Sequence, residues 1–282
     1  MSRFFVYWDV WRYNFLVPTP FYHLSLAEEL LELTSLPAGI RHFIHSQHNE
    51  FLFGNTAPDV QVLSGQPREA THFFSLPIQA SDQFAWEALL FHHPHLANFE
   101  RLQPGQVGFL AGYLCHLQAD WMWIRQIFAP VFGPRGSWGN FKDRLYYHNV
   151  LRAYLDRSVV AGLGDISINE VQPDHWLPFV QDCHLVRWRD FLSRQLQPGE
   201  TTLTVEVFSS RQGVAAPEYY ALLGSEVRMQ REVFSHIPLE QVQGYRNSVL
   251  NENIGLLTNY LAFALHQDEI VIEGNLPQGA QL

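Results

Sequence analysis

One histidine and one aspartate share a face in the most apolar part of the sequence. His116 and Asp120 stand four residues apart in the segment GYLCHLQADWMW, residues 112–123. In an α-helix this spacing places both side chains on one face, with Cβ atoms about 5 to 6 Å apart. An imidazole and a carboxylate at that separation suit two ligands of one metal ion. A hydrogen-bonded His–Asp pair that satisfies itself inside a core is the competing interpretation.

A second carboxylate follows a rigid turn. The segment FLFGNTAPD ends at Asp59, where an apolar run breaks at Gly54 and Pro58. Pro58 fixes its own φ angle and restricts the residue before it, so a stiff backbone presents Asp59. We treat Asp59 as a candidate ligand and general base. Taken alone, a helix N-cap or a turn aspartate is the simpler interpretation of this residue.

Two further histidines lie beside apolar residues. His72 lies in ATHFF, residues 70–74, and His23 lies in TPFYH, residues 19–23, where a helix is expected to begin. Each of them alone is typical of a core histidine that hydrogen-bonds within the protein. Arg68 precedes His72 by four residues. Its guanidinium can receive a phosphate bidentately, or it can pair with a ligand carboxylate.

Taken together, these segments resemble the zinc-dependent phospholipase C family, an all-α group related to the single-strand-specific zinc nucleases. The ordered motifs TPxxH, FLxGxxAPD, THF and GxxxHxxxD carry the resemblance, which covers about half of the chain, from Pro18 to Asp156. The resemblance implies that four side chains surround one zinc ion: Asp59, His72, His116 and Asp120. It implies that a neighbouring ion takes His23 and a shared oxygen of Asp120.

The resemblance also implies a reaction. It implies hydrolysis of phosphoric diesters by zinc-activated water, with a phospholipid or another small phosphodiester as the substrate and Asp59 as the general base. Two histidines and two carboxylates do supply the nitrogen and oxygen donors that zinc prefers, and zinc lowers the pKa of bound water to about 7. We therefore predict a metal-dependent hydrolase of the phospholipase C type, with Arg68 as a substrate-binding residue.

The chain departs from this family at a later helix. His148 matches a family ligand, but Arg152 stands four residues later, where the family has a glutamate, and a guanidinium cannot ligate a cation. Asp156 lies two turns from His148, about 12 Å along a helix, which is too far to share one ion. We therefore expect one or two zinc ions rather than three. Two other functions stay open: a degenerate metal-binding relative without turnover, and a nuclease-like hydrolase of short nucleotides.

The composition indicates a packed globular protein and excludes several classes. Of the 282 residues, 47% are hydrophobic and 16% are charged, so the chain is not disordered. A net charge of −10 disfavours binding of long nucleic acids, because their affinity comes largely from Lys and Arg. The two cysteines, Cys115 and Cys183, cannot build a disulfide framework or a Cys-rich zinc module. A metal site must therefore use histidine and carboxylate side chains.

The sequence contains no segment typical of export or of membrane insertion. No stretch reaches the roughly 18 to 20 uninterrupted apolar residues of a membrane span. Asp9 and Arg12 interrupt the aromatic stretch that would have to form a signal-peptide core. We therefore expect a cytoplasmic protein, with peripheral membrane contact at most. The sequence does not define the oligomeric state.

The elements that must position these residues are predicted to be helices. The longest apolar pattern runs from Val107 to Phe128, and helical periodicity dominates the rest. Further helices are expected at 21–33, 84–91, 141–160, 175–195, 217–234 and 249–265, and short strands at 203–208 and 269–273. We predict an all-α, multi-helix single domain of the phospholipase C or zinc nuclease type, with at most a minor pair of short strands. It covers residues 20–270, between an extension (1–19) and a tail (271–282).

Overall fold

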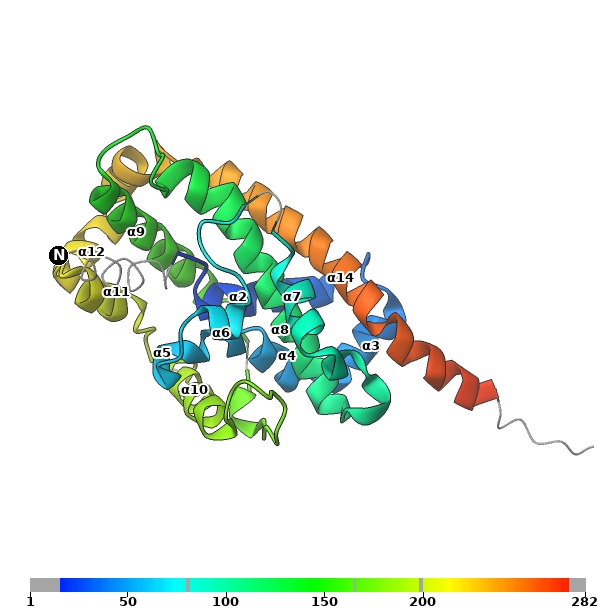
Figure 1. The fold of residues 1–282 in the computed structure, drawn as a ribbon. Coiled ribbons are helices and arrows are strands. Elements are labelled where there is room, and N and C mark those ends of the chain that lie inside the picture. Colours follow the sequence, from blue (N-terminus) through cyan, green and yellow to red (C-terminus); the bar gives the residue numbers. More distant parts are fainter. Residues whose placement is uncertain (1–15, 80–81, 165, 198–199, 274–282) are drawn as a thin grey trace, which may run out of the picture.

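The computed structural model describes residues 16–79, 82–164, 166–197 and 200–273, and helices follow one another through these ranges (Figure 1). The α-helices are α2 (Pro20–Glu32), α3 (Ala38–Ser46), α4 (His48–Gly54), α5 (Gln61–Ser64), α6 (Glu69–His72), α7 (Ala85–His92), α8 (Pro104–Trp123), α9 (Phe141–Val160), α10 (Asp182–Gln195), α11 (Thr204–Gln212), α12 (Ala216–Leu223), α13 (Glu226–Met229) and α14 (Leu239–Glu273). Shorter helical turns are η1 (Ala57–Val60), η2 (Pro94–Ala97), η3 (Phe99–Arg101), η4 (Ile124–Phe132), η5 (Ile168–Glu170) and η6 (Gln230–Phe234). The predicted all-α single domain is confirmed.

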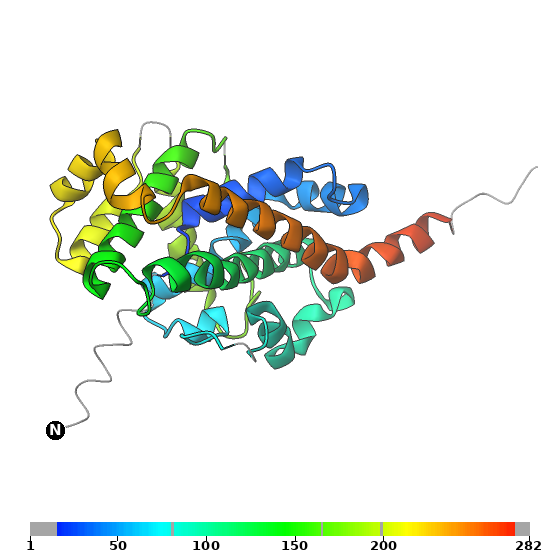
Figure 2. The same ribbon diagram turned by 90° about the horizontal axis from the view of Figure 1, so that it is seen from above.

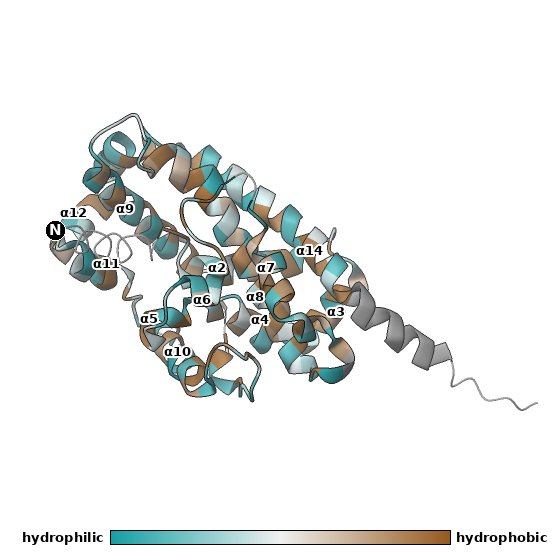
Figure 3. Ribbon diagram, in the orientation of Figure 1, coloured by the Kyte–Doolittle hydropathy of each residue, from teal (hydrophilic) through white to brown (hydrophobic). Residues whose placement is uncertain are grey.

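Helix α8 forms the centre of the fold. Every residue from Val107 to Trp123 is buried, as expected for a helix that is apolar on all sides. Helix α4 packs on α8, and the long helix α14 runs beside it in both views (Figures 1 and 2). Apolar residues concentrate on α8, whereas the outer helices α9 and α10 carry more hydrophilic residues (Figure 3). Consequently, a polar group on α8 must find its partners inside the protein.

Two glycines let α4 and α8 approach each other closely. A Cβ atom on Gly54 would lie 2.0 Å from the carbonyl oxygen of Phe109, and one on Gly112 would lie 2.1 Å from that of Phe51. No side chain fits at either position, because the obstacle is backbone. This contact holds the segment that follows α4, which includes Asp59, against the helix that carries His116 and Asp120.

The two predicted strands are wrong. Residues 204–212 form α11, in which the buried Val205 and Phe208 are three residues apart and share a helix face. Residues 269–273 belong to α14, and no proline interrupts that helix over its 35 residues. In the described residues no β-strand occurs. The alternation of Val and Thr suggested a strand at 203–208, but packing of this segment on α9 decides in favour of a helix.

Three predicted helix boundaries also differ from the structure. The helix expected at 175–195 begins at Asp182, because His175 has a positive φ of 53° that no helix accepts. The helix expected at 217–234 is divided near Gly224, and the central helix continues beyond Trp123 as η4. The predicted extension and tail are described only at 16–19 and 271–273, and the remainder of each lies outside the described residues.

The expected absence of a membrane-spanning helix agrees with the structure of the described ranges. None of their helices combines the length and the apolar character that crossing a bilayer requires.

The close contact between α4 and α8 predicts the effect of a single methyl group. Gly112→Ala is expected to lower the free energy of unfolding by about 2 to 3 kcal/mol, because the new Cβ meets a backbone carbonyl that can move only with its helix. The matched control is Gly244→Ala in α14, where no atom lies within 4 Å of the added Cβ and a gain of about 0.5 to 1 kcal/mol is expected. Urea denaturation measures both values. Similar effects of the two substitutions would contradict the close approach.

Candidate metal centre

The structure brings together five of the predicted site residues from four elements. Helix α8 contributes two of them, and α2, η1 and α6 contribute one each. Four of the side chains are at most 1% exposed, whereas the fifth, Asp59, is 10% exposed. The five residues are His23, Asp59, His72, His116 and Asp120.

Asp120 lies at the centre of this group. Its Oδ1 atom is 3.1 Å from His23 Nε2, and its Oδ2 atom is 3.3 Å from His72 Nε2 and 3.5 Å from His116 Nε2. Asp59 approaches from the other side, with Oδ1 3.6 Å from His72 Nε2. The rings of His23 and His116 stack with their centroids 3.9 Å apart. Three imidazoles and two carboxylates therefore lie close together around Asp120.

Hydrogen bonds behind two of the three histidines direct their Nε2 atoms into the site. His116 Nδ1 lies 2.8 Å from the carbonyl oxygen of Asn55, which can only accept a hydrogen bond. His72 Nδ1 lies 2.9 Å from Thr71 Oγ1 and 3.3 Å from the carbonyl oxygen of Arg68. These contacts assign the ring proton to Nδ1 and leave a lone pair on Nε2, the arrangement found behind metal-ligating histidines.

Several polar atoms in this group lack a hydrogen-bond partner. They are His23 Nε2, His72 Nε2, His116 Nε2 and Asp120 Oδ1, each buried and without a directed hydrogen bond to any part of the chain that the structure describes. Leaving a buried polar atom unsatisfied costs about 1 to 3 kcal/mol, and a bound cation would satisfy several of these atoms at once. The buried His and Asp groups could therefore hold a metal ion.

The charges of the site fit the same interpretation. Burial by itself would raise the pKa of Asp120, but His116 and the two other histidines outweigh it and hold the pKa well below its usual range. Burial would likewise raise the pKa of Asp59, and His72 and His116 reverse the shift. Burial and the charge of His116 lower the pKa of His23 to about 4. Two ionised carboxylates and a neutral His23 are protonation states that bind metals. Although burial alone would lower the pKa of His116, Asp120 and Asp59 raise it, so a metal ion would have to displace a proton from this ring.

The geometry favours one fully ligated ion. Ligand atoms within 4.8 Å of one another form two overlapping groups, His23 with His116 and Asp120, and Asp59 with His72 and His116. Both groups need His116, whose Nδ1 already contacts Asn55, so its single remaining lone pair can serve one ion. Two complete centres cannot form at the same time from these residues.

Arg68 occupies the place of an ion-pair partner. Its Nη2 atom donates to Asp120 Oδ2 at 2.5 Å, and its guanidinium lies over the ring of Phe74, 4.5 Å from the centroid. The side chain is only 3% exposed. Of the two roles considered for Arg68, the pairing with a ligand carboxylate is the one present in the structure.

His148 does not join the five residues. The indole Nε1 of Trp123 donates to His148 Nε2 at 3.0 Å, so this nitrogen is an acceptor and the ring proton lies on Nδ1. Burial and the charge of Arg152 hold the pKa of His148 well below its usual range. A metal ion beside His148 would meet the same positive charge, so α9 contributes no ligand of the kind predicted.

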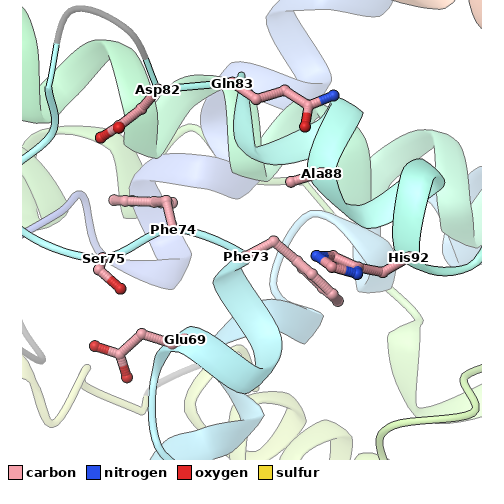
Figure 4. Close-up of a pocket in the computed structure, with 8 residues that line it drawn as sticks. All are labelled: Glu69, Phe73, Phe74, Ser75, Asp82, Gln83, Ala88 and His92. Atoms are coloured by element: carbon pink, nitrogen blue, oxygen red, sulfur yellow. The ribbon is translucent and has the colours of Figure 1, made fainter.

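A surface pocket of about 520 Å³ lies behind a wall of the buried site. Phe74 forms that wall, since its ring contacts His72 at a centroid distance of 6.4 Å and also lines the pocket. Figure 4 shows the lining residues, which come from α6, α7 and the segments before and after them: Glu69, Phe73, Phe74, Ser75, Asp82, Gln83, Ala88 and His92.

The sequence did not reveal a third group of potential ligands. Asp174, His175 and Asp182 bring ligand atoms within 4.8 Å of one another. The His175 side chain is 94% exposed, and its backbone N–H donates to Asp182 Oδ2. Exposed carboxylates of this kind are common on protein surfaces without an ion. In the sequence, the only signal for this group is that the two aspartates and the histidine lie within nine consecutive residues.

Asp156 positions the helix that carries His23. This buried carboxylate accepts hydrogen bonds from Thr19, directly before α2, and from Thr204 of α11, the latter at 2.5 Å. One turn into α2, the His23 N–H donates to the carbonyl of Thr19. Burial raises the pKa of Asp156 to about 6, although both threonines and Arg152 act in the opposite direction. From the sequence, Asp156 was considered only as a possible metal ligand beside His148, and its role in positioning α2 was missed.

Metal analysis is expected to separate His116 from His148. We expect purified, zinc-treated protein to hold about one equivalent of zinc, and His116→Asn to weaken zinc binding by more than about tenfold, because a first ligand is lost. His148→Asn removes an imidazole of the same size from an equally buried position and is expected to retain the metal. Mass spectrometry for metals, with circular dichroism as the folding control, gives both values. Equal metal loss in the two variants would contradict this ligand set.

Asp156 predicts a pH-dependent stability difference. Because its pKa is raised on folding, the folded state binds more protons than the unfolded state between about pH 4 and pH 6, so ionising Asp156 lowers wild-type stability as pH rises through that window. Asp156→Asn cannot titrate. The free energy of unfolding of the variant minus that of wild type is expected to rise by about 1 to 2 kcal/mol from pH 5 to pH 7.5, measured by urea denaturation. A difference independent of pH would count against the raised pKa.

Comparisons of the chain with protein-family models, with curated proteins and with solved structures returned no match. The functional interpretation therefore rests on the contacts described above and on the motifs of the sequence.

Proposed function

We propose that this protein is a metal-dependent hydrolase of phosphoric diesters, similar in its chemistry to the zinc-dependent phospholipases C. One observation carries the proposal: three imidazole Nε2 atoms and a carboxylate oxygen are buried close to one another without directed hydrogen bonds among the described residues, and they belong to two overlapping groups of potential metal ligands. His23 Nε2 and Asp120 Oδ1 lie 3.1 Å apart and can pair with each other, whereas the Nε2 atoms of His72 and His116 have only the two carboxylates of the group beside them.

The residues that would hold the ion are His23, Asp59, His72, His116 and Asp120. Nitrogen and oxygen donors without cysteine suit zinc, and the two carboxylates neutralise a divalent charge in a buried site. When bound, zinc supplies Lewis-acid chemistry, lowering the pKa of a coordinated water and polarising a phosphoryl oxygen.

Asp59 is the residue best placed to move a proton. It is the most exposed member of the group, and its lowered pKa keeps the carboxylate ionised at neutral pH. In the proposed reaction the oxygen of a water molecule attacks phosphorus, and Asp59 accepts a proton from that water. The bond from phosphorus to the leaving oxygen then breaks, and this oxygen takes a proton from solvent. The products are a phosphate monoester and an alcohol.

The neighbouring pocket supports a small substrate. Its 520 Å³ and its mixed lining of aromatic and carboxylate side chains suit the organic part of a phospholipid head or of a similar diester. The net charge of −10 also favours a small substrate, because a long polyanion would be repelled.

A non-catalytic metal-binding protein is the second candidate. The observation in its favour is the near-complete burial of His23, His72, His116 and Asp120, which leaves Asp59 as the point of access for a substrate. The buried ion pair of Arg68 with Asp120 is also typical of an interaction that stabilises a fold. Turnover distinguishes the two candidates.

Hydrolysis of bis-p-nitrophenyl phosphate tests the proposal. We expect the zinc-loaded protein to release nitrophenol, a chelator to stop the reaction, and Asp59→Asn to reduce kcat by about 10² to 10⁴ while zinc remains bound. The exposed Asp174→Asn is the matched control and is expected to keep wild-type activity. Absence of chelator-sensitive turnover in loaded wild type would favour the non-catalytic candidate. A choline phospholipid and a dinucleotide, assayed in parallel, separate phospholipase-like from nuclease-like specificity.

A further inference from the structure

Arg68 is a buried arginine whose hydrogen-bond donors are only partly used. Its side chain is 3% exposed, and its Nη2 atom donates to Asp120 Oδ2 at 2.5 Å. Its Nε and Nη1 atoms are buried and have no directed hydrogen bond to any residue that the structure describes. A guanidinium carries five N–H donors, so the pair with Asp120 leaves most of them unsatisfied. Buried donors without a partner are costly, which indicates that a ligand satisfies them.

Two other buried arginines have no such unused nitrogen atoms. All three nitrogens of the Arg189 guanidinium donate hydrogen bonds, to Asp190 and to a backbone carbonyl. All three nitrogens of Arg144 donate to backbone carbonyls in the segment 133–139. Arg189 is the closer comparison, because it is buried and paired with an aspartate as Arg68 is. The two ion pairs therefore differ in the donors that they leave free.

Arg68 contacts both the buried metal-ligand candidates and a wall of the surface pocket. It donates to Asp120, the carboxylate at the centre of the candidate site. Its guanidinium also lies over the ring of Phe74, with Cζ 4.5 Å from the centroid, and this ring lines the pocket of about 520 Å³. The next residue in the chain, Glu69, lines the same pocket (Figure 4). An oxyanion bound to Arg68 would therefore adjoin both the ion and the pocket.

The charges of the site favour an anion beside a bound metal ion. The two carboxylates, Asp59 and Asp120, and the guanidinium of Arg68 together carry one net negative charge. A divalent ion would reverse this to one net positive charge, which a singly charged phosphodiester neutralises. In the pocket itself, the carboxylates of Glu69 and Asp82 disfavour an anion. The phosphate group is therefore expected at Arg68, and the organic part of the ligand in the pocket.

We propose that Arg68 binds the phosphoryl oxygens of a ligand through its Nε and Nη1 atoms, while Nη2 stays paired with Asp120. Charge-assisted hydrogen bonds from a guanidinium to phosphate are among the strong ones in proteins. The proposed role keeps the ion pair intact, because it uses different nitrogens. The inference deepens the proposed hydrolase function and rests on it for the identity of the substrate. Binding of inorganic phosphate can nevertheless be measured without any turnover.

Isothermal titration calorimetry of the full, zinc-loaded chain with inorganic phosphate tests this role. We expect Arg68→Lys to weaken phosphate binding by at least about tenfold, because an ammonium can still pair with Asp120 but lacks the additional donors of the guanidinium. Arg189→Lys is the matched control: it makes the same change in a buried ion pair whose nitrogens are all in use, and is expected to leave phosphate binding unchanged. The zinc content of both variants is expected to match wild type.

A second measurement needs no variant. Crystals of the zinc-loaded wild-type protein are soaked with arsenate, a phosphate analogue that anomalous scattering locates. We expect an arsenate oxygen within about 3.2 Å of Nε or Nη1 of Arg68. This measurement decides the question if Arg68→Lys fails to fold or to retain zinc.

Three results would overturn the inference: no measurable phosphate binding by wild type, equal phosphate binding by wild type and a zinc-loaded Arg68→Lys, or arsenate bound away from Arg68. Failure of the hydrolase proposal is distinguishable from all three. A protein without chelator-sensitive turnover, whose phosphate binding still depends on Arg68, would retain the anion site and lose the enzymatic function. A protein with turnover, whose phosphate affinity is independent of Arg68, would lose the anion site alone.

Discussion

The burial of an ionised carboxylate in the middle of the most apolar helix is the constraint on which the rest of the site depends. Asp120 is fully buried, yet its surroundings hold its pKa well below the ordinary range. A buried charge is tolerated only when opposite charges or hydrogen-bond donors compensate for lost hydration. Arg68 supplies one compensating charge, and three histidines supply the remaining contacts. One histidine is on α8 itself, and the others must come from different elements.

The fold delivers these partners through short, rigid connections. Glycines 54 and 112 allow α4 to lie against α8, and this contact places the carbonyl of Asn55 behind His116. Helix α6 is a single turn, and the carbonyl of Arg68 at its start contacts the His72 ring at its end. On the opposite side, Asp156 joins α2 and α11 to α9. The rings of His72 and His116 therefore each have a partner that orients them, and His23 is positioned through its helix.

Helix α9 shows how one substitution of charge type changes what a site can bind. A glutamate at position 152 could have joined His148 as a ligand, whereas the positive charge of Arg152 disfavours a cation there. The nearby metal-ligand candidates keep their carboxylates. A cation is therefore favoured around Asp120 and disfavoured beside Arg152.

The sequence by itself determined the helical class and the pair His116 and Asp120, because helical periodicity and His–Asp spacing are local properties. His23, Asp59 and His72 were joined to that pair only through motifs that resemble a known family. It misassigned residues 203–208, where local alternation competed with packing on α9. Only the tertiary structure decided three contacts: His23 stacks on His116, the Trp123 indole donates a hydrogen bond to His148, and Arg68 pairs with Asp120. These contacts join residues 25 to 93 positions apart in the chain, and a distance of that kind is set by helix packing rather than by any local pattern.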